Sequence, residues 1–501
     1  MIEGLAVNLP PSSKTVPLDI LIVGSGFSGL CLALQMHSAG RRWYLVEQAA
    51  ELGGTWRDNH YPGAACDIPS NLYSFSFMPN PNWSRLYPPQ AEIKAYMNRC
   101  ADDGGIRHGM RFNATVKRAQ WVESGAYWQV TMTDGTEICA RTVALATGGL
   151  SRPLMPQISG LDQFAGTLFH SAQWRHDVDL VGKRVGVIGT GASAIQIVPA
   201  IVSQCASLTL FQRTPPWIIP RQDREVSKAT HDRYRRHPWR QKLDRALTYV
   251  RLESRMLGFT RAVGLLRYAQ TRVLRYLHAK VRDPDLRQRL TPNYTLGCKR
   301  ILLSDDYYPA LQKPNVQLVD HGVVRATPRG VLSADGQEHE LDVLIAATGF
   351  KVADAGAPFE VLGRNGHDLN SQWAGGPQAY LGTVVAGFPN LFVMTGPNTG
   401  LGHNSMVYVI ESQARYVVRA LLALERSAAA AFDVRADVQT RFNEQLQQRL
   451  AGSVWNTGGC QSWYLARDGS NRVLWPDFTF RLRKRLAYFD WRDFHAIGTV
   501  Q

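Results

Sequence analysis

Two stretches of the chain begin with a short, mainly apolar run and continue through a glycine-rich turn into a helical pattern. The first run covers residues 18–23 (LDILIV) and is followed by GSGFSG at residues 24–29. The second covers residues 184–188 (RVGVI) and is followed by GTGASA at residues 189–194. A short apolar run without alternation is typical of a strand buried on both faces of a parallel sheet. Both stretches therefore predict strand–turn–helix units of an α/β domain.

The first glycine turn is suited to the pyrophosphate of a dinucleotide. Gly24 permits the tight bend, Gly26 lets the backbone approach a phosphate, and Gly29 allows close packing of helix and strand. Ser28 lies in the same turn, and the helix N-terminus that follows it favours negative charge. Glu47 ends the next apolar run, 23 positions after Gly24, where a carboxylate can bind ribose hydroxyls. This site is predicted to take an unphosphorylated ribose, as in FAD or NAD; the alternative is a tight turn that binds nothing.

The second turn differs at the end of its following strand. An apolar run at residues 208–212 leads into Arg213, 24 positions after Gly189, where the first turn has a carboxylate. A cation at this place can pair with a 2′-phosphate, so NADP(H) is predicted in preference to NAD(H), unless Arg213 is an ordinary surface charge. The residues assigned to this site are Gly189, Thr190, Gly191, Ala192, Ser193, Gln196, Arg213 and Thr214.

Each turn is followed later in the chain by an apolar strand that ends in Ala-Thr-Gly. These strands lie at residues 142–148 (TVALATG) and 341–349 (LDVLIAATG). The duplication predicts two nucleotide-binding domains, the second inserted in the first, with the chain crossing between them after each Ala-Thr-Gly. Alternating apolar residues at 112–136, with Asp134 and Gly135 near their end, predict a β-hairpin.

Residues 221–290 interrupt the second unit with a helical pattern. Apolar residues recur there at roughly three-to-four spacing, at Leu243, Leu247, Val250, Leu257 and Leu265. The segment holds 19 Lys and Arg against 7 Asp and Glu, so it carries +12 of the formal net charge of +15. We interpret it as a solvated face of helices, with RNA or lipid binding as the less favoured alternative.

The cysteines and the early apolar run bear on where in the cell the protein is expected. Seven cysteines include no C-x-x-C pair, which favours reduced thiols in a cytosolic protein over a disulfide scaffold or a zinc site, and no metal site is predicted. The apolar run at residues 18–36 is broken by glycines and has no basic leader, so it predicts neither a signal peptide nor a membrane span. We therefore predict a cytoplasmic protein, a monomer or weak homo-oligomer, with no membrane or nucleic-acid partner.

Four further motifs occur in a fixed order along the chain. They are Y-P-G-A-x-C-D at residues 61–67, F-x-G-x-x-x-H-x-x-x-W at 164–174, G-x-K-R at 297–300 and A-T-G-F at 347–350. Together with the two glycine turns they resemble the flavin-containing (class B, type I) Baeyer–Villiger monooxygenases, which convert ketones into esters or lactones. The resemblance extends from residue 18 to about residue 493. One departure is Arg175, because the family usually has Pro or Asp after the Trp.

The resemblance implies an α/β fold with two Rossmann-like domains, the NADP-binding domain inserted in the FAD-binding domain, and a helical subdomain that forms one wall of the substrate cavity. The implied order is FAD domain (residues 1–150), NADP domain (151–220), helical subdomain (221–290), NADP domain (291–350) and FAD domain (351–501). The implied cofactors are FAD and NADPH. The implied reaction inserts one oxygen atom of O2 next to a ketone carbonyl through a C4a-peroxyflavin.

The resemblance also implies contacts with the cofactors. On the flavin side, Trp56 and Tyr73 lie against the ring, Met406 touches it, and the backbone at Val116 contacts the adenine end. The other residues expected in the flavin-wrapping segment are Gly54, Thr55 and Asp67.

On the NADP side, the resemblance places Lys299 on the same phosphate as Arg213. His170 lies at the domain linker, where it couples NADP binding to domain closure. Trp463 lies on a C-terminal loop that closes over the nicotinamide; the alternative is a buried aromatic residue.

Arg300 and Asp67 are the predicted catalytic residues. An unprotonated peroxide that attacks a ketone needs an opposite charge in a water-poor pocket, and so does the anionic adduct that follows. Arginine supplies that charge without titrating near neutral pH. Asp67 is predicted to pair with Arg300 and hold its guanidinium in position. Without the flavin motifs, a structural Arg–Asp pair between domains would be the preferred interpretation.

Other functions remain as alternatives. A flavin monooxygenase that oxygenates amines or sulfides shares both glycine turns, but its fingerprint usually ends in Tyr or Phe where this chain has Trp174. A disulfide reductase is disfavoured because no closely spaced cysteine pair follows the first domain. An alternative from a different class is a protein that only binds nucleotides, as a redox sensor, or that binds nucleic acid through its basic helices. Consumption of NADPH and O2 by the yellow purified protein would exclude it. The expected small-molecule partners are therefore a ketone and O2.

Overall fold

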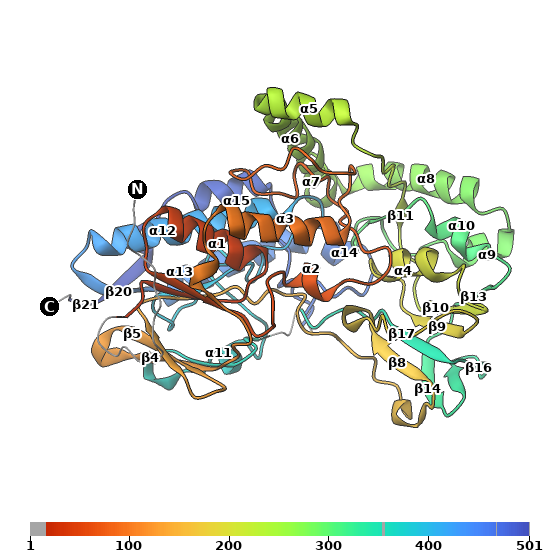
Figure 1. Cartoon of the computed structure of the whole chain (residues 1–501), viewed down its shortest axis with the longest axis horizontal. Helices are drawn as coiled ribbons and strands as arrows, with labels where there is room; N and C mark the ends of the chain where they lie inside the picture. Colours follow the sequence, from red (N-terminus) through yellow and green to blue (C-terminus); the bar gives the residue numbers. More distant parts are fainter. Residues whose placement is uncertain (1–16, 353–355, 467, 500–501) are drawn as a thin grey trace.

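Two five-stranded parallel sheets lie behind the two glycine turns and form the centres of two α/β domains (Figure 1). The computed structural model describes residues 17–352, 356–466 and 468–499. The strand order of the first sheet is β19 (Leu391–Val393), β7 (Val143–Leu145), β1 (Ile20–Val23), β2 (Trp43–Val46) and β3 (Met110–Arg111). The order of the second is β13 (Val316–Val319), β10 (Ser207–Phe211), β9 (Arg184–Ile188), β17 (Val343–Ala346) and β8 (Thr167–His170).

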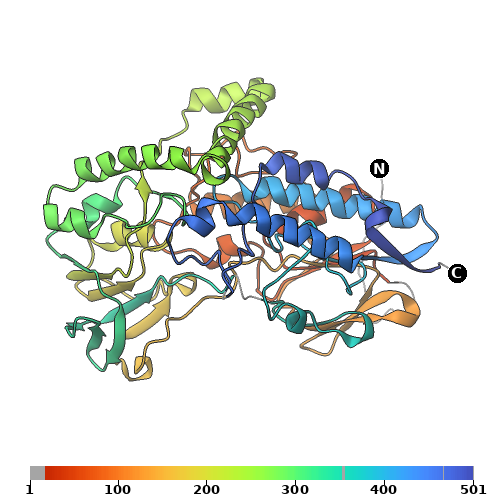
Figure 2. The same cartoon turned by 180° about the vertical axis from the view of Figure 1, so that it is seen from behind.

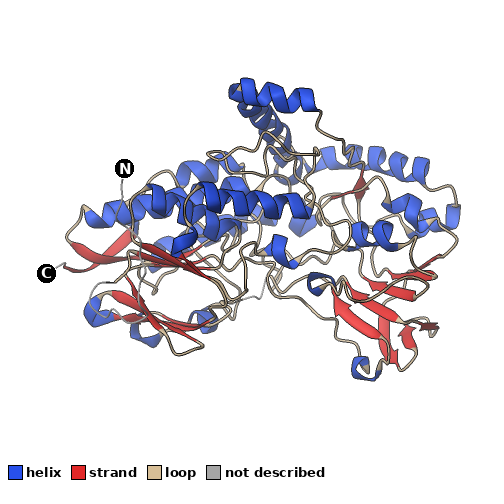
Figure 3. Cartoon of the chain, in the orientation of Figure 1, coloured by secondary structure: helices blue, strands red, loops and turns tan. Residues whose placement is uncertain are grey.

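The second sheet is inserted within the first along the chain. All its strands lie between residues 167 and 346, whereas the first sheet takes β1, β2, β3 and β7 from before that segment and β19 from after it. Figure 3 shows the two groups of strands at separate ends of the molecule. The predicted fold, with one Rossmann-like domain nested in the other, is confirmed.

The Ala-Thr-Gly strands explain why each turn begins with glycine. β7 pairs with β1, and β17 pairs with β9, so each Ala-Thr-Gly strand lies directly behind a glycine turn. Gly24 and Gly189 have φ of +105° and +109°, a conformation that L side chains rarely adopt. A Cβ on Gly24 would lie 2.6 Å from the carbonyl oxygen of Ala146, and one on Gly189 would lie 2.5 Å from that of Ala347. Both turns therefore require glycine for the same two reasons.

Helices cover both sheets (Figures 1 and 2), and α1 packs against α12. Up to residue 201 the helices are α1 (Phe27–Ser38), α2 (Thr55–Asp58), α3 (Gln90–Asp103) and α4 (Ala194–Ile201). The segment between β11 (Ile218–Ile219) and β12 (Leu302–Leu303) holds α5 (Lys228–Arg236), α6 (Pro238–Glu253), α7 (Met256–Thr260), α8 (Val263–Lys280) and α9 (Pro284–Arg289). The later helices are α10 (Tyr307–Leu311), α11 (Leu369–Gln372), α12 (Met406–Glu425), α13 (Ala436–Ala451), α14 (Val454–Thr457) and α15 (Thr479–Arg485).

The predicted hairpin is part of a larger antiparallel unit. β4 (Val116–Val122), β5 (Tyr127–Met132) and β6 (Glu137–Ala140) form a meander, and β18 (Glu360–Leu362) pairs with β4 in parallel. Asp134 and Gly135 form the turn between β5 and β6, not the one between β4 and β5. The remaining strands are β11 (Ile218–Ile219), β12 (Leu302–Leu303), β14 (Val323–Thr327), β15 (Gly330–Ser333), β16 (Glu338–Glu340), β20 (Ala429–Val434) and β21 (Phe494–Thr499).

The segment predicted to be helical is helical, but the apolar residues on which that prediction rested face outward. The five apolar residues that gave the helical spacing are all 43–62% exposed, namely Leu243, Leu247, Val250, Leu257 and Leu265. α6 is instead buried through Gln241, Leu252 and Glu253. No helix in the described part of the chain is both long and apolar enough to span a bilayer.

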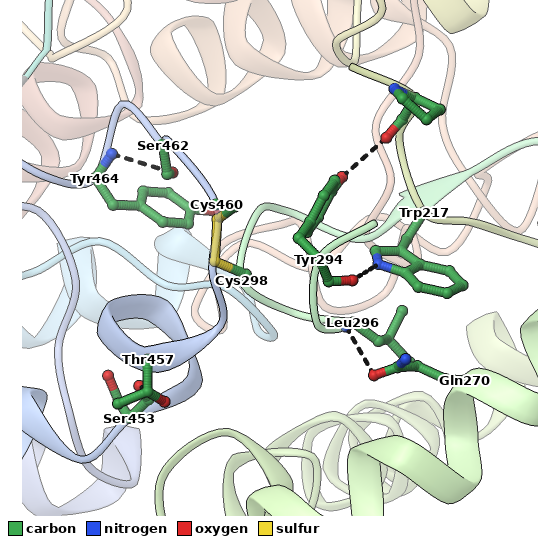
Figure 4. The surroundings of a disulfide bond; sticks show 11 residues. Trp217, Gln270, Tyr294, Leu296, Cys298, Ser453, Thr457, Cys460, Ser462 and Tyr464 are labelled. Atoms are coloured by element: carbon green, nitrogen blue, oxygen red, sulfur yellow. Dashed lines mark hydrogen bonds between the residues drawn. A yellow bond between two sulfur atoms is a disulfide. The ribbon is translucent and has the colours of Figure 1, made fainter. Parts of the chain in front are cut away.

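The expectation that all cysteines are reduced is wrong. Cys298 and Cys460 form a disulfide, although 162 positions separate them in the sequence (Figure 4). The fold brings together the loop before Lys299 and the segment after α14, a proximity that local cysteine spacing cannot reveal. The other five cysteines, all within the described residues, lie outside any disulfide. Groups of three or more potential metal ligands are absent from the same described residues.

Candidate active site

Arg300 and Asp67 meet at the junction of the two domains. Asp67 belongs to the segment after α2, and Arg300 lies in the loop between α9 and β12. Nε and Nη2 of Arg300 each donate a hydrogen bond of 2.7 Å to a different carboxylate oxygen of Asp67. Nη1 donates to the carbonyl oxygen of Leu401 at 3.3 Å. The two hydrogen bonds fix the orientation of the guanidinium, and the side chains of Arg300 and Asp67 remain 29% and 27% exposed.

The pair is held in its charged form. Burial alone would raise the pKa of Asp67, but the charge and hydrogen bonds of Arg300 lower that pKa below its usual value. The Asp67 carboxylate in turn raises the pKa of Arg300, against the opposing effect of burial. The site therefore offers a permanent positive charge whose direction is set by a carboxylate.

Tyr464 is a site neighbour that the sequence did not single out. Its side chain is 1% exposed, and burial raises its pKa to about 12 although the Arg300 charge acts in the opposite direction. The Cys298–Cys460 disulfide ties the segment that carries Tyr464 to the loop that carries Arg300 (Figure 4). An uncharged phenol thus lies near enough to the guanidinium to respond to its charge. Tyr464 is far from the G-x-K-R motif in the sequence, so its role as a neighbour of Arg300 becomes visible only in the fold.

The first glycine turn forms a backbone cradle with the flavin-wrapping segment. Gly54 has φ of +51°, and a Cβ on it would lie 2.9 Å from Cα of Gly26, so the two glycines lie backbone against backbone. Trp56 donates from Nε1 to the hydroxyl of Tyr73 at 3.0 Å, and the two rings are edge to face. Thr55 is the first residue of α2. The close glycines and the adjoining aromatic pair fit the predicted FAD.

Glu47 lies at the C-terminal end of β2 beside this turn. Its carboxylate accepts hydrogen bonds of 2.8 Å from both the backbone and the hydroxyl of Ser25, and one of 3.0 Å from the backbone of Ala49. Arg57 forms an ion pair with it at 3.1 Å. The backbone of Glu47 also accepts from Ala114, two residues before Val116, so the structure brings these predicted residues together. Ser28 is buried in the first turn of α1.

The second glycine turn has an open approach and two neighbouring cations. No atom lies within 4 Å of a Cβ built on Gly191, and Ala192 beside it is exposed. Burial lowers the pKa of Lys299, and the charge of nearby Arg213 lowers it further. Neither cation forms an ion pair with a carboxylate of the described residues. Two adjacent unneutralised cations fit an anionic group such as the 2′-phosphate of NADP.

Other residues of the predicted NADP set lie in the second glycine turn and at the start of α4, and two of them form hydrogen bonds within the protein. Thr190 donates from its hydroxyl to the carbonyl oxygen of Thr214 at 2.9 Å, which ties the turn to the end of β10. Ser193 precedes the first residue of α4. Gln196 on α4 accepts from the Tyr61 hydroxyl at 3.0 Å and donates to the carbonyl oxygen of Ala65 at 2.9 Å. The amide of Gln196 therefore joins the two domains beside Asp67.

His170 is fixed between two backbone groups. Its Nδ1 accepts from the backbone N–H of Ala172 at 3.0 Å, so Nε2 carries the proton and donates to the carbonyl oxygen of Gly349 at 3.0 Å. Burial lowers its pKa, which keeps the ring neutral. His170 thus connects the end of β8 to the A-T-G-F motif. Trp174 is buried against Phe169, whereas the unusual Arg175 is exposed and paired with Asp177.

Met406 and Trp463 occupy less enclosed positions. Met406 is the first residue of α12, where Ser405 accepts a hydrogen bond from the backbone as N-cap. Trp463 is 47% exposed and packs against Tyr464 with ring centroids 4.5 Å apart. The exposed ring agrees with a loop contact to a bound cofactor better than with the alternative of a buried aromatic residue.

Glu253 is a second residue that the sequence did not single out. This buried carboxylate at the end of α6 accepts from Nδ2 of Asn404 at 2.6 Å and from the hydroxyl of Thr479 at 2.9 Å. His403 lies 3.3 Å from the same carboxylate oxygen. Glu253 therefore joins the helical segment to the loop that begins at Leu401, whose carbonyl accepts from Arg300.

We expect Glu253→Gln to lower stability in a pH-dependent way. Burial would raise the pKa of Glu253, but hydrogen bonds and charge from His403 and its other partners lower it. A lowered folded-state pKa gives stability that is present above the unfolded pKa and lost as the pH falls through the folded value. The variant should lose about 1–3 kcal/mol at neutral pH and little at acid pH, measured by unfolding of the holoenzyme at several pH values.

Asp433→Asn is the matched control with the opposite sign. Burial raises the pKa of Asp433 to about 6, so its ionisation reduces stability as the pH rises from the unfolded value through about 6. This variant should be neutral or stabilising at neutral pH. An equal loss for Glu253→Gln at acid and neutral pH would contradict the account.

We expect the disulfide to stabilise the fold. A cross-link over 162 positions restricts the unfolded chain and is expected to contribute about 2–4 kcal/mol. The Cys298→Ser/Cys460→Ser variant should therefore melt at a lower temperature, and dithiothreitol should lower the melting temperature of the unaltered protein but not of this variant. Melting temperatures that do not respond to either change would show that the cross-link makes no contribution.

Comparison with known proteins agrees with this geometry. The sequence matches the family described as flavin-binding monooxygenase-like over residues 18–355. It is 47% identical to a Baeyer–Villiger monooxygenase of Pseudomonas aeruginosa, over 99% of this chain and 95% of the relative. The structure is similar to an oxidised steroid monooxygenase bound to NADP, with a TM-score of 0.85, 31% identity, and coverage of 96% of this chain and 100% of that one. It is also similar to OTEMO in complex with FAD and NADP, with a TM-score of 0.87, 28% identity, and coverage of 96% and 99%.

The chain belongs to the flavin-binding monooxygenase-like family and, within it, to the Baeyer–Villiger monooxygenases. The resemblance inferred from the motifs is therefore confirmed, together with the class of enzyme, a flavin monooxygenase.

Proposed function

We propose that this chain uses FAD and NADPH to insert one oxygen atom of O2 next to a ketone carbonyl, giving an ester or lactone, with Arg300 and Asp67 as catalytic residues. The observation that carries this proposal is the bidentate Arg300–Asp67 pair, with both hydrogen bonds at 2.7 Å, at the junction of two dinucleotide turns. FAD would be held by the cradle around Gly26 and Gly54, and NADPH by the turn around Gly191.

The role of the pair follows from its charge. Bound FAD and NADPH would supply the redox chemistry that activates O2 for oxygen transfer. A Baeyer–Villiger reaction builds negative charge on oxygen before a carbon migrates, and a fixed cation stabilises that charge without reorganisation. Arg300 supplies the cation, and Asp67 keeps its guanidinium oriented. Nη1 of Arg300 also donates a hydrogen bond to the Leu401 carbonyl oxygen. Tyr464, which is buried and uncharged near neutral pH, adds no charge that would oppose the guanidinium.

The other residues of the site complete the proposal. Glu47 would bind the ribose of FAD, while Lys299 and Arg213 would bind the 2′-phosphate of NADPH. His170 would transmit cofactor binding through Gly349 to the domain linker. We assign residues 1–150 and 351–501 to the FAD domain, 151–220 and 291–350 to the NADP domain, and 221–290 to a helical subdomain beside the substrate site. We further propose a cytoplasmic enzyme that works as a monomer or weak homo-oligomer.

Product analysis tests the reaction class. The yellow holoenzyme is incubated aerobically with NADPH and a panel of linear ketones, cyclic ketones and a thioether, with hydrogen peroxide measured alongside. Esters or lactones from at least one ketone are expected, identified by mass spectrometry. Sulfoxide without ester from any ketone would favour the amine- and sulfide-oxygenating class instead and would contradict the proposal.

A further inference from the structure

α6 presents an apolar stripe to solvent that the active site does not use. The four members of this α6 stripe are Trp239, Leu243, Leu247 and Val250, which are 58%, 48%, 59% and 62% exposed. Intervals of four, four and three residues place them on one face of the helix. Single exposed apolar residues are ordinary, but four large ones along one helix form a patch of the kind that marks an interaction site.

The opposite face of α6 fixes the helix to the body of the protein. Gln241 donates to the carbonyl oxygen of Asn80 at 2.7 Å, and Arg245 donates to that of Ser74 at 2.8 Å. Glu253 makes the buried contacts with Asn404 and Thr479 described above. These polar contacts determine which side of α6 faces inward. The α6 stripe is therefore a surface of the folded protein and cannot turn into its core without breaking them.

Exposed cations border the stripe on both sides. At about 100° per residue, Lys242 lies on one flank, and Arg240 and Arg251 lie on the other. The preceding helix, α5, adds exposed Arg235 and Arg236. Figure 1 shows α5 and α6 projecting from the remainder of the protein, which agrees with the high exposure of the stripe.

The charge decides between possible occupants. Two copies of the chain joined through this face would bring together two segments that each carry 19 basic and 7 acidic residues, which is repulsive. An anionic surface is attracted instead. A Trp- and Leu-bearing apolar stripe between rows of Arg and Lys is the pattern of a helix that lies in a membrane interface.

We propose that the α6 stripe docks this protein on an anionic lipid surface. Trp239, Leu243, Leu247 and Val250 enter the headgroup region while Arg240, Lys242 and Arg251 contact lipid phosphates. No membrane span is needed, and the cytoplasmic leaflet of a membrane is anionic, in agreement with a cytoplasmic enzyme. The sequence favoured a merely solvated basic face; the exposed apolar residues between the cations are what change that interpretation.

Vesicle sedimentation tests the docking surface. The holoenzyme should pellet with vesicles of phosphatidylglycerol and phosphatidylcholine, pellet much less with phosphatidylcholine alone, and dissociate as salt is raised. Leu243→Gln/Leu247→Gln should weaken binding at least about tenfold, because two apolar side chains leave the interface. Lys242→Glu should weaken it at least about fivefold.

The matched control is Val181→Gln/Val324→Gln, which removes two exposed apolar side chains, 65% and 48% exposed, from the second domain. It should bind vesicles like the unaltered protein, and all variants should keep the same rate of NADPH oxidation. Absence of binding to any vesicle would overturn the proposal. Vesicle binding that stays unchanged in Leu243→Gln/Leu247→Gln would also overturn it. So would a dimer in solution, or binding to an acidic protein, that this variant loses while its lipid binding stays the same.

Discussion

Arg300→Ala should abolish ester formation while NADPH still reduces the flavin. The guanidinium is the cation that faces developing negative charge at the site, and removal of a single oxyanion-stabilising group from an enzyme typically costs about 10²–10³ in kcat. NADPH binding depends on a different pair of cations, so anaerobic flavin reduction by NADPH should stay within a few fold. The expected result is NADPH consumption that yields hydrogen peroxide in place of ester. Ester and hydrogen peroxide are assayed in parallel.

Arg175→Ala is the control for this variant. Arg175 is an exposed arginine paired with Asp177 and should be replaceable without effect on ester yield. Asp67→Ala should show a weaker defect than Arg300→Ala, because the cation remains and only its orientation is lost. An unchanged ester yield in Arg300→Ala would exclude the proposed catalytic role.

Lys299→Ala and Arg213→Ala should each raise KM for NADPH by roughly tenfold to a hundredfold, the effect of losing a charge-assisted hydrogen bond to phosphate. KM for NADH should change little, because NADH has no 2′-phosphate. Steady-state oxidation of each nucleotide with a fixed ketone gives both values, so the variants should lose their preference for NADPH.

Lys183→Ala provides the control, since Lys183 is an exposed lysine of the same domain. It should leave both KM values unchanged. If Lys299→Ala and Arg213→Ala raised KM for NADH and NADPH equally, the two cations would not bind the 2′-phosphate.

The nested fold could be predicted because its signals are local. Each glycine turn is set by positive φ and by a carbonyl oxygen 2.5–2.6 Å from the position of a missing Cβ, so the residue type is dictated by backbone geometry. The Ala-Thr-Gly strand that supplies this carbonyl repeats in both domains. The Arg300–Asp67 pair could be anticipated for a different reason: both residues lie in motifs that occur in family order.

The features that were missed depend on residues far apart in the sequence. The Cys298–Cys460 disulfide spans 162 positions, and Glu253 takes its partners from residues 403–404 and 479. Apolar spacing revealed that residues 221–290 are helical but not which face is buried. On α6, the inward face is held by hydrogen bonds of Gln241 and Arg245, which hydrophobic periodicity does not register.

Isotope labelling with oxygen-18 gas shows whether the inserted oxygen atom comes from O2. The holoenzyme is incubated with NADPH, a ketone that gives an ester, and labelled O2, and the product is examined by mass spectrometry. We expect an ester or lactone that carries one oxygen-18 atom, in the inserted position beside the carbonyl. An unlabelled ester, or labelled hydrogen peroxide with no ester from any ketone, would contradict this expectation.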